Sequence, residues 1–122
     1  IIVGDGTDNF SATTNVKPGV LEGAYFYDPE GEVKTFVRGR IDWHSRDPQW
    51  EDKKGFRGAD DVEKPLGQWN RIECYATGSN LLIYLNGKLV NRIYNVKPQK
   101  GKIQIQSEGA EIFIRKVDLQ RL

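Results

Sequence analysis

The sequence contains no methionine, one cysteine and one histidine, and these scarcities exclude several kinds of site. A zinc centre built from several histidines of one chain is excluded, because His44 stands alone. Cys74 has no second cysteine with which to form an internal disulfide. It alternates with Ile72 and Ala76, and no activating base lies in the pattern around it. We therefore interpret Cys74 as a buried structural thiol.

Motifs of several enzyme classes are also absent. The sequence has no glycine-rich phosphate loop, no paired-cysteine or paired-histidine metal motif and no nucleophile elbow. Lys and Arg together number 18 against 17 Asp and Glu, which gives no reason to expect nucleic acid or an acidic membrane surface as a partner. No apolar run approaches the roughly 20 residues that span a bilayer, so we expect no transmembrane segment.

The chain begins on the apolar run 1–3 rather than on a methionine. Such a run is typical of the inside of a strand, so we interpret the chain either as a processed one or as one that starts inside a strand. Two interpretations stay open: a complete domain, and one that a preceding segment or a second chain completes.

The residues that are abundant favour strands. Thirteen glycines, five tyrosines, five phenylalanines and three tryptophans are typical of strands and tight turns. Strands are predicted over residues 23–27, 32–38, 69–76, 81–85, 88–94, 101–106 and 110–119. Turns are predicted at residues 28–31 and 77–80 and at Asn86-Gly87, a dipeptide suited to the positive φ angles of a type I′ hairpin.

Short connections between the last five predicted strands imply antiparallel neighbours. The predicted fold class is therefore all-β, an antiparallel β-sandwich or jelly roll, with residues 1–122 as a single domain or its C-terminal portion. The expected core includes alternating apolar residues of these strands: Ile72, Ile83, Val90, Ile103, Ile105, Ile112 and Ile114. Residues 42–66 lack periodicity, and an irregular loop of this length is often functional.

His44 lies in this loop among aromatic and charged residues. A histidine there is able to act as a general acid or base near neutral pH, with Asp42, Asp47 or Glu51 to orient it. The alternative is a surface histidine in a polar loop.

Two other features of the loop also leave alternatives open. Trp43 and Trp50 either stack on a sugar ring or anchor the loop to the sandwich. The charged run at residues 60–64 is either solvated surface or a calcium site, although its spacing is not that of an EF-hand.

Residues 101–113 combine a strand pattern with an acidic turn. If Ile103 and Ile105 face the core, Gln106 projects from the opposite face and Glu108 follows near the same side. Such side chains hydrogen-bond to sugar hydroxyls, and a carboxylate there is also able to move a proton or hold a metal ion. The alternative is a solvated outer face.

Two stretches resemble a known family. They are EKPLGQWNRIECYATGSNLLIYLNGKLVN, residues 63–91, and GKIQIQSEGAEIFIRKVDL, residues 101–119. Both resemble the C-terminal half of the 3-keto-disaccharide hydrolase domain, first catalogued as a domain of unknown function. The matching features are residues 63–65, Gly67, Trp69-Asn70, Asn86-Gly87, Val90-Asn91, and Gly101 and Ile103 followed by residues 106–115; Trp69-Asn70 and Asn86-Gly87 are mainly signals of the fold. The loop pieces HSRDPQW and KGFRGADDVEKP are similar to one branch of that family.

The resemblance implies a concanavalin-like jelly roll exported by glycan-degrading bacteria, hence a periplasmic, secreted or cell-surface location. It also implies action on sugars oxidised at C3, either cleavage of 3-keto-glycosides or hydration of the derived 3-keto-2-hydroxy-glucal. A ketone at C3 acidifies the C2 proton, so a base is able to remove it and the enediolate expels the C1 substituent. A divalent metal ion at the C3 oxygen is a candidate cofactor.

On this basis we predict that His44 and Glu108 transfer protons. The predicted substrate-binding residues are Arg38, Arg40, Trp43, Gln106 and Glu111. The substrate is expected to be a carbohydrate or glycoside on a concave sheet face beside the loop of His44. Two alternatives stay open: a non-catalytic carbohydrate-binding module, and a structural fragment completed by another segment.

Overall fold

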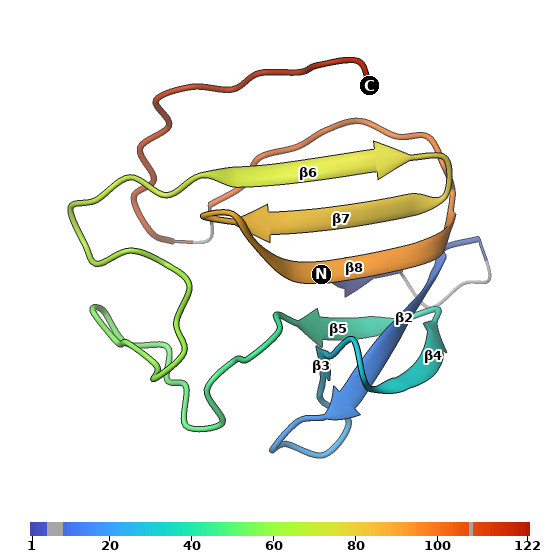
Figure 1. The fold of residues 1–122 in the computed structure, drawn as a ribbon, viewed down its shortest axis with the longest axis horizontal. Helices are drawn as coiled ribbons and strands as arrows, with labels where there is room; N and C mark the ends of the chain where they lie inside the picture. The colour runs from blue at the N-terminus through green and yellow to red at the C-terminus, as the bar shows by residue number, and fades with distance from the viewer. Residues whose placement is uncertain (5–8, 108) are drawn as a thin grey trace.

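A computed structural model describes residues 1–4, 9–107 and 109–122. Within these residues the regular structure consists of strands and includes no helix, as Figure 1 shows, which confirms the predicted all-β class. The strands are β1 (Ile2–Val3), β2 (Ser11–Pro18), β3 (Tyr25–Tyr27), β4 (Glu32–Phe36), β5 (Gly39–Asp42), β6 (Ile72–Thr77), β7 (Asn80–Leu85) and β8 (Lys88–Lys97).

The strands form one curled sheet in the order β1-β5-β3-β2-β8-β7-β6, and β4 pairs with β2 off this path. The strand pairs are antiparallel except for β3 with β5, which is parallel. β2 is the centre of the sheet, because it pairs with β3, β4 and β8. Segments far apart in the sequence are thereby joined at β2.

Strands β6, β7 and β8 form the predicted meander. Asn86 and Gly87 have φ angles of 51° and 83° and join β7 to β8, so that Leu85 pairs with Lys88. These positive φ angles are those that the Asn-Gly dipeptide tolerates best. A second short turn at Gly78-Ser79 pairs Thr77 with Asn80. Both hairpin predictions are confirmed.

The core is formed by β2 and the strands around it. The sequence had instead predicted a core from the alternating apolar residues of the second half of the chain. The buried members of the observed core are Val3, Ala12, Val16, Tyr27, Phe36, Ile41 and Ile93. Of the predicted core residues, Val90 is buried and Ile83 is half-buried. Ile72 was wrongly assigned to the core: it is 68% exposed. The physical reason is that β6 is the last strand of the sheet, where a residue gains neighbours on one side only.

Cys74 shares a face with Ile72 and Ala76, as the alternation predicts, but it is exposed. The interpretation as a fully buried thiol is therefore wrong, for the same reason that applies to Ile72. The remaining burial of Cys74 still raises the pKa of its thiol.

The C-terminal residues do not form the predicted strands 101–106 and 110–119. The described residues from 101 onward form no strand, and Ile103, Ile105, Ile112 and Ile114 are all exposed rather than core. Figure 1 shows this C-terminal segment (residues 101–107 and 109–122) running along the outer side of β6. A strand needs a neighbour that shares its backbone hydrogen bonds, and here the alternating segment does not pair with the edge of β6.

The β5–β6 loop (residues 43–71) is irregular throughout but contains tight turns. Backbone N–H groups of Arg46, Trp50 and Phe56 donate to the carbonyls three residues before them. In the described part of the chain, no helix is long and apolar enough to cross a membrane.

Candidate active site

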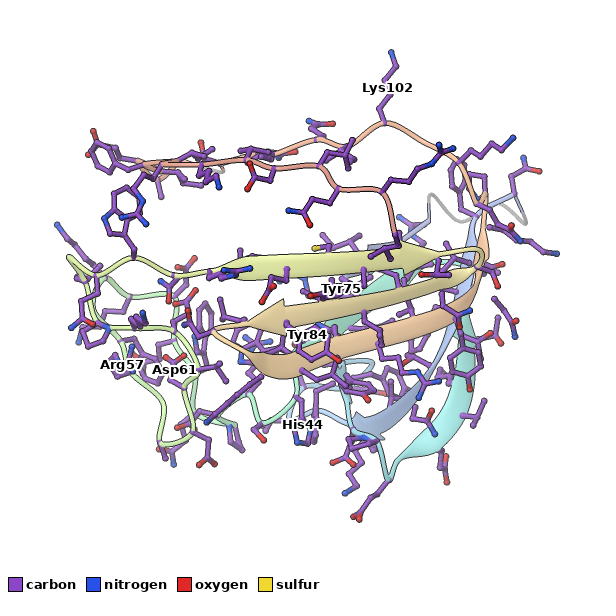
Figure 2. The ribbon with its side chains drawn as sticks, turned by 45° about the horizontal axis from the view of Figure 1, so that its top comes forward. His44, Arg57, Asp61, Tyr75, Tyr84 and Lys102 are labelled. Atoms are coloured by element: carbon purple, nitrogen blue, oxygen red, sulfur yellow. The ribbon has the colours of Figure 1, made fainter. Side chains whose placement is uncertain are left out.

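One side of the β6–β8 meander carries aromatic and charged side chains. Glu73 pairs with Tyr84, Tyr75 pairs with Leu82, and Leu82 pairs with Arg92 on the next strand. Paired residues lie on the same side of a sheet, so all five share one face. The Tyr75 and Tyr84 rings are edge to face, 5.7 Å apart between centroids, and both are labelled in Figure 2. This polar face offers ring surfaces and hydrogen-bonding groups together, which a sugar requires.

Glu73 is held in place on this face by two donors. Arg71 Nη2 lies 2.9 Å from Glu73 Oε1, and the Tyr75 hydroxyl lies 3.3 Å from the same oxygen. These contacts orient the carboxylate within the polar face.

His44, two residues beyond β5, makes two contacts with the sheet. Its backbone N–H donates to the carbonyl of Val90 over 2.8 Å, and its ring Nδ1 lies 3.2 Å from the carbonyl oxygen of Tyr27. A carbonyl oxygen only accepts, so Nδ1 carries the proton of the neutral ring. The Tyr27 ring packs edge to face on the imidazole, 6.0 Å away between centroids. This arrangement leaves the lone pair of His44 on Nε2.

Tyr27 connects His44 to the polar face. Its side chain is buried, and this burial raises the pKa of the phenol. The charge of Arg92 opposes that increase, whereas Asp28 and Tyr84 reinforce it. Groups from the turn after β3, from β7 and from β8 therefore interact electrostatically with the phenol of Tyr27, the residue whose carbonyl orients the imidazole.

Asp28 forms the turn that follows Tyr27. Its Oδ1 accepts the backbone N–H of Glu30 at 2.8 Å, and its Oδ2 lies 3.0 Å from Lys17 Nζ. The Glu30 hydrogen bond, followed by Lys17, lowers the pKa of the Asp28 carboxyl, and a protonated His44 acts in the same direction. A carboxylate is thus held near the imidazole, and it stabilises the turn that positions Tyr27.

A row of aromatic rings follows His44 into the β5–β6 loop. Trp43 and Trp50 are 5.9 Å apart between ring centroids, and Trp50 and Phe56 are 6.3 Å apart. The Arg46 guanidinium lies over both tryptophans, 5.1 Å and 4.7 Å from their centroids, and forms an ion pair with Asp42. These contacts stabilise the loop beside His44.

The structure places the predicted site residues in separate regions. His44 and Trp43 lie together at the start of the β5–β6 loop. Arg38 is exposed between β4 and β5, and Arg40 lies on β5 opposite Ile2. Each of the two arginines is thus at the β1 end of the sheet order rather than on the β6–β8 polar face.

Gln106 and Glu111 belong to the exposed C-terminal segment. Figure 2 shows Lys102 of that segment and His44 on opposite sides of the β6–β8 strands. The expectation of one sugar-facing row on a strand at 101–106 is therefore not met, because that strand does not form. Glu108 lies outside the described residues.

Metal ligands do not converge in the described ranges 1–4, 9–107 and 109–122. No three histidine, cysteine, aspartate or glutamate side chains there could together hold a metal ion.

Tyr27, Tyr84 and Arg92 are absent from the predicted site. The tight turn at residues 86–87 indicates which residues of β7 and β8 are opposite each other, but the register shifts by a bulge at Ile83 and Tyr84. A pairing counted from the turn alone therefore fails beyond this point. The approach of Tyr27 to Tyr84 and Arg92 is still harder to predict, because β3 lies more than 50 residues before β7 in the sequence.

Comparison with known proteins gives a family match. The model of a family described as the 3-keto-alpha-glucoside-1,2-lyase-like domain matches residues 9–120. This range includes strands β2 to β8, the β5–β6 loop and most of the C-terminal segment. No curated protein and no solved structure matches the chain.

Proposed function

Because the chain belongs to the family of 3-keto-alpha-glucoside-1,2-lyase-like domains, we propose that it cleaves 3-keto-α-glucosides by elimination, with His44 as the base. One observation carries this assignment: the Tyr27 carbonyl accepts a hydrogen bond from Nδ1–H, so Nε2 holds the lone pair that a base needs. The family name supports the substrate class, and the geometry supports the residue.

The reaction starts at C2 of the sugar. Nε2 of His44 takes the C2 proton, which the C3 ketone acidifies, and the electrons of the broken C–H bond form an enediolate. That enediolate forms the C1–C2 double bond as the C1–O bond breaks. The leaving alkoxide takes up a proton, so the products are a 3-keto-2-hydroxy-glucal and an alcohol, with no water consumed.

Negative charge develops on the C3 oxygen during proton removal. Arg92 and Tyr84 carry donor groups on the polar face, and both interact electrostatically with Tyr27 beside His44. We propose that they hydrogen-bond to this oxygen, because preorganised donors stabilise an oxyanion more than the ground-state ketone. Glu73 and Tyr75 on the same face then bind hydroxyl groups and the C–H face of the ring.

We also propose Glu108 as a proton-transfer residue, here as the donor to the leaving group. Its replacement by glutamine removes the titratable proton while retaining the size of the side chain. If Glu108 has this role, the E108Q variant slows a poor alkoxide leaving group more than a good aryloxide one. Equal rates for E108Q and the unaltered protein on both substrates remove Glu108 from the mechanism.

A second candidate function is non-catalytic carbohydrate binding. The edge-to-face pair of Tyr75 and Tyr84 favours it, because aromatic rings on an accessible sheet face bind sugars without any proton transfer. It predicts binding of unoxidised oligosaccharides and no product from keto-glucosides.

Replacement of His44 by glutamine tests the proposed lyase. The substrate is a nitrophenyl 3-keto-α-glucoside, and release of the nitrophenolate is followed by absorbance. We expect kcat/KM to fall by about 10²- to 10⁴-fold in H44Q, the usual contribution of a general base.

Lys102→Gln is the matched control, because Lys102 lies on the other side of the β6–β8 strands. Circular dichroism establishes that both variants are folded. Retention of full activity in folded H44Q refutes His44 as the base, and turnover by neither variant nor parent favours the binding function.

A further inference from the structure

The β5–β6 loop contains a hollow of about 410 Å³ that the chemistry at His44 does not use. Its apolar wall consists of Trp50, Phe56, Pro65 and Leu66. We propose that this hollow binds a neutral sugar unit, namely the leaving-group sugar of a 3-keto-disaccharide whose oxidised ring lies at His44. The proposal rests on the proposed function and adds the position of the second sugar.

The charges around the hollow favour a neutral ligand. It is lined by three acidic and three basic residues: Glu51, Asp61, Glu63, Lys53, Arg57 and Lys64. Their formal charges cancel, so neither an anion nor a cation is preferred. Carboxylates accept and cationic groups donate hydrogen bonds, which matches both roles of a sugar hydroxyl. Figure 2 locates Arg57 and Asp61, one donor and one acceptor, in this loop.

The apolar wall of the hollow suits the C–H groups of a sugar, as the charged residues suit its hydroxyl groups. The C–H face of a pyranose packs on aromatic and aliphatic surface, and Phe56 and Leu66 supply both. Leu66 is 74% exposed, so its side chain is accessible to a ligand.

Hydrogen bonds hold the loop in place around the hollow. Asn86 of the β7–β8 turn donates through Nδ2 to the carbonyl of Val62 at 2.9 Å and to Asn70 Oδ1 at 2.8 Å. Asn70 Oδ1 also accepts the backbone N–H of Lys64 at 2.8 Å. An irregular loop tied in this way to a regular hairpin is largely preformed, so a ligand pays little ordering entropy on binding.

Aromatic rings connect the hollow to His44. Trp43, the residue before His44, contacts Trp50, and Trp50 contacts Phe56 in the hollow. Packed rings of the loop thus link the two regions, and the proposed disaccharide extends from one to the other.

Binding of maltose, an unoxidised neutral disaccharide, tests the hollow without any turnover. Titration calorimetry is performed with the parent protein, H44Q, F56A and L66S. We expect equal affinity for the parent and H44Q, and about tenfold weaker binding by F56A and L66S, because each loses apolar contact area. Leu21→Ser is the matched control: Leu21 is equally exposed but lies in the turn after β2, and its loss should change nothing.

Absence of maltose binding to the parent overturns the proposal, as does unchanged affinity in both F56A and L66S. Binding of an anionic uronic-acid disaccharide in preference to maltose also overturns it. Loss of His44 catalysis is a separate result, because H44Q is expected to bind maltose normally.

Kinetics then place the bound sugar relative to the reaction. With a 3-keto-disaccharide, L66S should raise KM about tenfold and leave kcat unchanged, whereas methyl 3-keto-α-glucoside, which has no second sugar, should be unaffected. An equal loss on both substrates contradicts a second-sugar site.

Discussion

The carboxylate of Asp28 stabilises the turn beside the proposed base, and its removal has a predictable pH dependence. Asp28 is buried and accepts the Glu30 N–H at 2.8 Å, with Lys17 Nζ at 3.0 Å. Asp28→Asn retains an acceptor but removes the charge. A hydrogen bond to a charged group contributes about 1.5–3 kcal/mol and a neutral one about 0.5–1.5 kcal/mol. The half-exposed Lys17 adds at most about 1 kcal/mol.

We therefore expect D28N to reduce the free energy of unfolding by about 1.5 kcal/mol at pH 7. The folded-state pKa of Asp28 is lowered below its ordinary value of 3.8 by these contacts. A carboxyl whose pKa is lowered by folding stabilises the folded state at pH values above its ordinary pKa. This stabilisation is lost as the pH falls through the folded-state pKa. The difference between D28N and the parent should consequently shrink as the pH falls below about 4.

Urea denaturation at pH 7, 4 and 2.5 measures this difference from the midpoints, provided that both proteins show the same m-value. Lys17→Gln is the control that removes only the ion pair, and it should cost less than about 1 kcal/mol. The reasoning is refuted by a D28N protein as stable as the parent at pH 7, or by a difference that stays constant down to pH 2.5.

Three further predictions concern packing and the thiol. Ile41 is fully buried, so Ile41→Ala should lower the free energy of unfolding by about 2–5 kcal/mol in urea denaturation; a loss below 1 kcal/mol contradicts its place in the core. Asn91 is buried and its Oδ1 has no hydrogen-bond partner among the residues that the structure describes, so the isosteric Asn91→Leu should leave the melting temperature unchanged or raise it, and a fall of several degrees would count against this account. Cys74 is exposed, so an aromatic disulfide reagent should label it without denaturant. Because the pKa of this thiol is raised, labelling at pH 8 should be slower than that of a free thiol. A requirement for urea would show that the thiol is inaccessible.

The predicted strands differ in outcome because some have partners and others do not. Strands β6, β7 and β8 were predicted from alternation and from two short turns, and all three form. The alternation at residues 101–106 and 110–119 is as regular, yet no strand forms there. β2 was not predicted because SATTNVKP is largely polar, although Ala12 and Val16 are buried in the core.

The site shows the same division. His44 was predicted as a base from its residue type and its irregular surroundings, and its chemistry requires only the imidazole. The orientation of that imidazole depends on the Tyr27 carbonyl, and the nearby charge depends on Arg92 of β8. Neither contact is visible in the sequence, because the residues are 17 and 48 positions away from His44.

The sequence by itself determined the all-β class, the two hairpin turns and the scarcity of histidine and cysteine that limits the chemistry. These properties are local: they follow from alternation, from the φ preferences of Asn and Gly, and from composition. Only the tertiary structure decided that β2 joins three strands, that β6 is an edge with exposed apolar residues, and that Tyr27 orients His44. These depend on pairings between distant segments, and the free energy of such a pairing is a property of both partners rather than of either sequence alone.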